Sequence, residues 1–193
     1  MKKLITIVVV LAMLMTIVST TAFATAPAPD AVVTGGTLAI TDLVIADFTP
    51  VTLDGTTQTT TAVVADTSLT DSTGSGGGWN VSLKASDFTL DAAGILAAAT
   101  GARTTLSKSS LELGTVTIVV TEVGSTAITN IVVSQGKIDT VAGINILSAP
   151  LNEGMGTYTV SMAPMTLTLL PNEVYAGTYT SIVTQTLTSG PDA

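Results

Sequence analysis

Glycine-containing turns divide this 193-residue chain into short segments rich in Thr, Val, Ile and Leu. Strands bounded by glycine at such regular intervals are typical of all-β domains. The spacing therefore predicts an all-β fold, a single antiparallel β-sandwich of Ig-like or barrel-like form. The turns fall at Gly35-Gly36, Asp54-Gly55, residues 74–78, Gly114, Gly124, Gly136, Gly143, residues 154–156 and Ala176-Gly177.

Apolar and polar residues alternate cleanly in two of these segments, 79–86 and 165–169. A period of two predicts strands with one buried face, which in the first segment carries Trp79 and Val81. Segment 115–120, TVTIVV, is more continuously apolar, and we expect it to be covered on both faces. A short helical turn is expected only in 91–102, where two glycines limit its length.

The first 24 residues have the pattern of a cleaved secretory signal peptide. Two lysines precede a long apolar run, and the small residues Ala22-Phe23-Ala24 end it. Residues 25–34 begin with TAPAPD, whose prolines predict a flexible leader. Residues 35–193 are then the folded domain of a secreted protein.

Composition excludes several classes of function. Loss of Lys2 and Lys3 leaves four basic against fourteen acidic residues, a net charge of −10, which excludes a nucleic-acid partner. The chain has neither His nor Cys, so we expect no His or Cys catalysis, no zinc site, no cofactor and no disulfide.

Carboxylates are the remaining chemistry. Asp66, Asp71, Asp87 and Asp91 fall near the glycine loop, but they lack the spacing of a calcium loop. We expect them to be solubilising, with no metal site and no catalytic residue. A carboxylate-based glycan hydrolase is the weakest alternative.

The C-terminal segment carries two further signals. Gly177-Thr178-Tyr179 before a strand resembles the corner of Ig-like domains, in which a tyrosine hydroxyl bonds back to the backbone. Tyr179, Val183, Gln185 and Leu187 share one face by period two. A glutamine is out of pattern there, so either that part of the strand is exposed or Gln185 replaces a larger flat side chain.

Four stretches follow one another along the chain: TGGTLAIT, DSTGSGGGWNVSLKASDFT, EGMGTYTV and LPNEVYAGTYTSIVTQTLTSGP. In these stretches and in their order, the chain resembles the WxL domain proteins of Gram-positive bacteria. The resemblance implies two Trp-x-Leu motifs and non-covalent attachment to the cell wall. Here the first motif is Trp79-Asn80-Val81, and the second, Gln185-Thr186-Leu187, has lost its tryptophan.

The function implied is a non-enzymatic, secreted protein held on peptidoglycan or another wall glycan. The resemblance adds as partners other WxL-type surface proteins and a membrane-anchored companion. Attachment is expected through Trp79, Asn80, Val81, Gln185 and Leu187. For the Trp79 side chain, packing at the edge of the core is favoured over direct ligand contact, and both hold if one edge of the indole stays open. The alternative is a structural subunit of a surface assembly, joined by strand edges without direct glycan binding.

Overall fold

The computed structural model describes residues 30–97 and 102–191. The predicted signal peptide and residues 25–29 of the leader lie outside them. Strands make up 40% of the chain and helix 4%, which confirms the all-β prediction. The strands are β1 Leu38–Ile40, β2 Gln58–Ala62, β3 Thr67–Asp71, β4 Trp79–Ala85, β5 Thr89–Leu90, β6 Leu111–Glu112, β7 Val116–Val120, β8 Val132–Val133, β9 Ile144–Ala149, β10 Gly156–Met162, β11 Met165–Leu169, β12 Tyr179–Thr180 and β13 Val183–Ser189.

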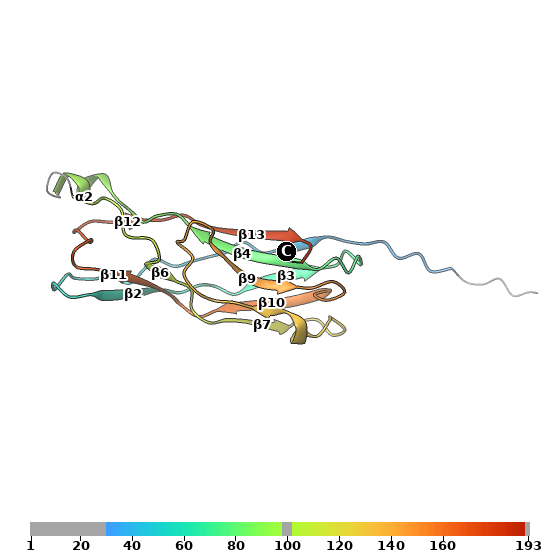
Figure 1. Ribbon diagram of the computed structural model, residues 1–193. Coiled ribbons are helices and arrows are strands. Elements are labelled where there is room, and N and C mark those ends of the chain that lie inside the picture. Colours follow the sequence, from blue (N-terminus) through green and yellow to red (C-terminus); the bar gives the residue numbers. More distant parts are fainter. Residues whose placement is uncertain (1–29, 98–101, 192–193) are drawn as a thin grey trace, which may run out of the picture. The chain divides into compact units, whose positions relative to one another are not determined.

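All strand pairs are antiparallel, and they are divided among four sheets (Figure 1). Two sheets have four strands, in the orders β1-β3-β10-β7 and β13-β4-β9-β8. A three-stranded sheet has the order β2-β11-β6, and the last sheet pairs β12 with β5.

The four sheets form two layers, because the same stretches of chain run from one sheet into the next. Residues 58–71, 111–120 and 156–169 each supply a strand to the β2-β11-β6 sheet and one to the β1-β3-β10-β7 sheet. Residues 79–90 and 179–189 continue the β13-β4-β9-β8 sheet into the β12-β5 pair in the same way.

A proline marks the interruption of the first layer. Pro164 lies between β10 and β11, and a proline cannot donate a ladder hydrogen bond. Gly114 crosses beside it, where an added Cβ would lie 2.7 Å from the Pro164 carbonyl oxygen. The Ala163 amide donates to the Thr115 carbonyl at 2.8 Å, so the layer stays joined across the break.

The two layers enclose one hydrophobic cluster. Along β4, Trp79, Val81, Leu83 and Ala85 are all buried, as the alternation predicts. β11 buries Met165, Leu167 and Leu169 in the same way. Tyr158 of β10 faces Trp79 from the other layer, with ring centroids 6.3 Å apart.

The prediction for segment 115–120 is wrong. Val116 and Ile118 are buried, but Val119 and Val120 are 53% and 42% exposed. Thr117 and Val119 share the outward face of β7 and are exposed, and Val120 lies at the end of this strand, which is the edge strand of its sheet. A run of apolar residues can occur in a strand with one exposed face as well as in a strand that is covered on both faces.

Helical structure is short. α2 spans Ala92–Ala97 within the segment where a turn is expected, whereas the 3-10 helix η1, Ile128–Asn130, lies outside that segment. Neither helical element in residues 30–97 and 102–191 has the length and apolar character of a membrane-spanning helix. The compact folded unit is Thr34–Ala193.

Candidate functional site

Trp79 lies in the core at the start of β4. Its side chain has no accessible surface, and its indole Nε1 donates to the Gly154 carbonyl at 2.9 Å. An indole N–H needs such an acceptor when it is buried. Val81, two residues along, is also fully buried. In this fold neither side chain can contact a wall polymer.

Glycines create the room for this tryptophan. A Cβ on Gly154 would lie 2.4 Å from the indole Nε1, and one on Gly78 would lie 2.4 Å from the Ala149 carbonyl oxygen. Both residues have positive φ, 75° and 71°, a conformation that favours glycine. The glycine residues around Trp79 are therefore explained by packing.

Two backbone hydrogen bonds hold the glycine loop, residues 74–78, to other parts of the chain. The Asn152 amide donates to the Gly76 carbonyl at 2.8 Å, and the Gly190 amide donates to the Gly78 carbonyl at 2.9 Å. Nearby, the Tyr158 hydroxyl lies 2.9 Å from the Thr126 and Met155 carbonyl oxygens. Burial raises the pKa of that hydroxyl above its usual value.

Gln185 and Leu187 lie on the inner side of β13, opposite Leu83 and Val81. Both are half-buried, because β13 is the edge strand of its sheet. The Gln185 Nε2 atom is buried and has no hydrogen-bond partner in the described part of the chain. Of the five predicted attachment residues, Asn80 therefore comes closest to an outward position, although its Nδ2 donates to the Gly190 carbonyl at 3.2 Å.

The outer face of the β13-β4-β9 sheet gathers hydroxyl and amide side chains. Register places Thr188 beside Asn80, Thr186 beside Ser82 and Thr184 beside Lys84. On the other side of β4, Asn145 and Ser148 of β9 extend the same face. None of these eight outward positions carries a carboxylate, in a chain with a net charge of −8. The alternation of residues 79–86 indicated part of this face, but only strand pairing completes it.

Lys84 is the cation of this outer face. Three other lysine and arginine residues are in ion pairs, Arg103 with Glu173 at 2.8 Å, Lys108 with Asp87 and Lys137 with Glu112 at 2.7 Å. Lys84 is exposed and has no ion pair within residues 30–97 and 102–191. It is therefore available to an anionic group of a ligand.

The four aspartates that lie near the glycine loop in sequence share no partner, and the expectation that they are solubilising is wrong for Asp71, which is buried. Asp71 Oδ1 accepts from the Thr73 amide and hydroxyl, and Asp87 pairs with Lys108. Asp91 Oδ1 accepts from the Gly94 amide at 2.9 Å, while Asp66 is exposed. The described residues contain no group of three or more side chains suited to a metal ion.

Asp139 is a buried carboxylate that sequence reasoning missed. Its Oδ2 accepts from the Ser110 amide at 2.7 Å, the Ser110 hydroxyl at 2.8 Å and the Leu111 amide at 3.0 Å. These bonds tie the start of β6 to residues 137–139. Its role is structural, and no local sequence pattern could have indicated its burial.

The C-terminal corner has the predicted hydrogen bond. The Tyr175 amide donates to the Tyr179 hydroxyl at 3.0 Å, so the side chain reaches back four residues along the chain. Gly177 is packed closely, since an added Cβ would lie 2.7 Å from Leu90 Cδ1 and 3.0 Å from the Gly94 Cα. Gly177 and Tyr179 thus hold the turn before β12 and β13.

Comparison with known protein families identifies the family of this chain. A family model described as WxL domain surface cell wall-binding matches residues 25–191. The chain belongs to the WxL domain family. Neither the comparison with curated proteins nor that with solved structures finds a match.

Membership gives this WxL domain a place on the cell surface, where it binds the cell wall. The first motif of the family is here a structural element, since Trp79 and Val81 fill the core. The second motif lies beside the first, with Leu187 opposite Val81. Strand pairing brings the two motifs together, but their buried side chains leave the outer face of the same strands as the accessible surface.

Proposed function

We propose that this WxL domain is a single β-sandwich that attaches a secreted, non-enzymatic protein to peptidoglycan through the outer face of the β13-β4-β9 sheet. The observation that carries the proposal is the chemistry of that face, which has hydroxyl and amide groups, the unpaired Lys84 and no carboxylate. Elsewhere the acidic side chains of this chain would repel an anionic wall.

The face matches the groups that peptidoglycan presents. Thr184, Thr186 and Thr188 are exposed and repeat along β13 about every 7 Å, which gives a row of donors and acceptors for sugar hydroxyl and acetamido groups. Lys84 can pair with a free carboxylate of a stem peptide. The full sequence has no His or Cys, and this supports a binding role in preference to catalysis.

The proposal is tested by placing carboxylates on the face. We expect Lys84→Glu and Thr186→Glu each to lower the sedimentation of purified residues 25–193 with peptidoglycan sacculi by about three- to tenfold. Thr117→Glu is the matched control, because Thr117 is an exposed threonine on the outer face of β7 in the other layer. Equal binding by all three variants and the parent protein would refute attachment through this face.

A second function, a subunit of a surface assembly, is favoured by a different observation. The edge strands β13 and β7 are long enough to pair with another chain. Other WxL-type proteins and a membrane-anchored companion are the partners proposed for such an assembly. Crosslinking at the cell surface that recovers these partners from the Lys84→Glu variant would separate assembly from wall attachment.

A further inference from the structure

A groove opens on one side of the domain, between residues 43–53 and residues 174–183. It consists of two adjoining cavities of about 510 and 570 Å³. The two cavities are neighbours, because Phe48, Phe88, Thr178 and Tyr179 line both of them. Each volume is within the range of ligand-binding sites.

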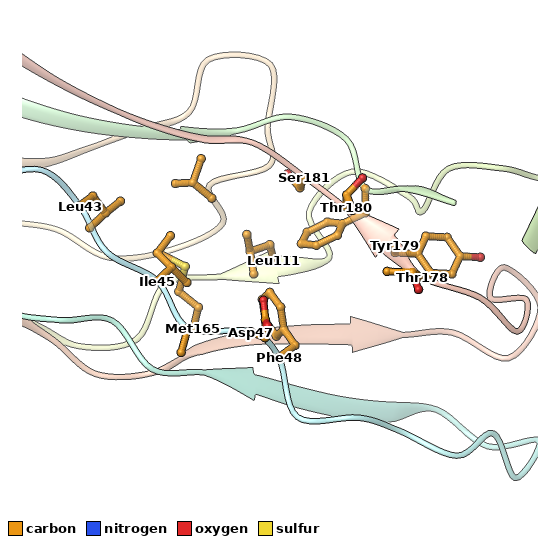
Figure 2. A pocket seen from close by; sticks show the side chains of 13 residues that line it. Leu43, Ile45, Asp47, Phe48, Leu111, Met165, Thr178, Tyr179, Thr180 and Ser181 are labelled. Carbon is orange, nitrogen blue, oxygen red and sulfur yellow. The ribbon is translucent and has the colours of Figure 1, made fainter. Parts of the chain in front are cut away.

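The core forms the floor of this groove. Figure 2 shows Leu111 between the segment that carries Ile45 and the segment that carries Ser181, and Met165 also lines this cavity. The rings of Phe48 and Phe88 meet edge to face, with centroids 5.9 Å apart. The groove therefore offers apolar pockets for side chains.

One wall of the groove is the edge of an extended segment around Ile45, which pairs with Val64 through a single antiparallel bridge. The Ala46 amide donates to the Val63 carbonyl, and the Ala65 amide donates to the Val44 carbonyl, each at 2.9 Å. Backbone groups of successive residues in an extended strand point in opposite directions. The amide and carbonyl groups of Ile45 therefore point away from its neighbour strand.

The opposite wall is a second free edge. The Asp91 amide donates to the Thr178 carbonyl at 2.8 Å, and the Ser86 amide donates to the Ile182 carbonyl at 2.9 Å. By the same rule, the backbone groups of Tyr179 and Ser181 point away from these partners, and this edge continues along β13. Two free edges thus border one apolar groove.

One side chain indicates the charge that a ligand of this groove should carry. Asp47 lines the groove, is exposed, and has no hydrogen bond or ion pair within the described ranges. The groove can therefore accept a positive charge at Asp47.

We propose that this groove binds an extended segment of a partner polypeptide by strand addition. The segment has apolar side chains at alternate positions and a Lys or Arg where it meets Asp47. Repeating backbone donors and acceptors on the groove walls favour a peptide over a glycan, whose recognition would not use strand edges. The proposal does not depend on wall attachment, because Lys84 and the threonines of β13 lie on the outer face and are absent from the groove lining.

The test uses the synthetic peptide Thr-Val-Thr-Val-Lys-Val-Thr-Val-Thr and the folded domain. We expect the peptide to shift the NMR signals of the Ile45, Tyr179 and Ser181 amides and to slow their hydrogen exchange. A peptide with Glu in place of Lys should bind up to about fivefold more weakly. Position 47 is exposed, so the Asp47→Lys variant should fold. This variant should prefer the peptide with Glu over the peptide with Lys, and its binding to sacculi should not change.

Backbone pairing between the peptide and the groove is tested by modifying the peptide, so that the protein itself is not altered. N-methylation of alternate peptide amides on one edge removes the donors that strand addition needs, and it should abolish binding. The proposal is overturned if the methylated peptide binds as well as its parent, or if no peptide shifts the groove amides. It is also overturned if N-acetylglucosamine oligomers shift these amides while the peptides do not.

Discussion

At the residue scale, the tryptophan that gives the motif its name acts through its hydrogen bond and its volume. Trp79 is held by the Gly154 carbonyl on one side and faces Tyr158 on the other. Gly154 approaches the indole so closely that no side chain fits. The turn between β9 and β10 is therefore part of the tryptophan site, although 75 residues separate the two positions in sequence.

Gly154→Ala should destabilise the domain more than a matched glycine substitution. Gly55 has a similar φ, +84° against +75°, but nothing lies within 4 Å of its added Cβ. Gly55→Ala is expected to cost about 1 kcal/mol of backbone strain. Gly154→Ala adds overpacking against the indole, a further cost of roughly 1–3 kcal/mol. Urea unfolding measures both, and equal costs would contradict the close contact.

At the element scale, the two strands that carry the motifs have different surroundings. β4 is an inner strand with four fully or almost fully buried side chains. β13 is an edge strand whose inward residues are half-buried. Gln185 therefore lies on an edge strand, where a polar side chain is tolerated.

Tyr179→Phe should loosen the turn before β12. The substitution leaves the Tyr175 amide without its acceptor, which is expected to cost about 1 kcal/mol. Hydrogen exchange at that amide should become faster, while exchange within β4 stays the same. Tyr175→Phe is the control, because no hydrogen bond of the Tyr175 hydroxyl is seen in the part of the chain described. An unchanged exchange rate in Tyr179→Phe would contradict a role of the hydroxyl.

At the scale of the whole molecule, charge is sorted by position. Exposed carboxylates such as Asp47, Asp66 and Glu122 lie in loops. The outer face of the β13-β4-β9 sheet has Lys84 and no carboxylate. The domain can therefore be acidic overall and still present a neutral to positive surface to a polymer.

Added salt should strengthen the binding of this domain to intact walls and weaken its binding to purified peptidoglycan. Screening weakens the repulsion between an acidic protein and anionic wall polymers, because the Debye length falls to about 10 Å at 0.1 M salt. Binding to intact walls is expected to rise between 20 and 200 mM salt by roughly two- to threefold. Binding to stripped sacculi should fall slightly as the Lys84 contact is screened. Sedimentation at both salt concentrations measures this, and a fall on intact walls would contradict a dominant repulsion.

The sequence by itself determined the local structure of this protein. Alternation predicted the buried faces of β4 and β11, and the Gly177-Thr178-Tyr179 pattern predicted the corner. These features depend on residues a few positions apart, so a linear pattern contains them. The prediction for segment 115–120 failed, because an apolar run does not say whether other residues cover the outward face of its strand.

Only the tertiary structure decided which surface is accessible. The burial of Trp79 depends on Gly154 and Tyr158, and the outer face depends on the register of β13 and β9 against β4. The groove at Phe48 exists because two strand edges from distant parts of the chain border a gap. Each of these features is set by pairing between segments far apart in sequence, and that pairing is fixed by the balance of packing across the whole core.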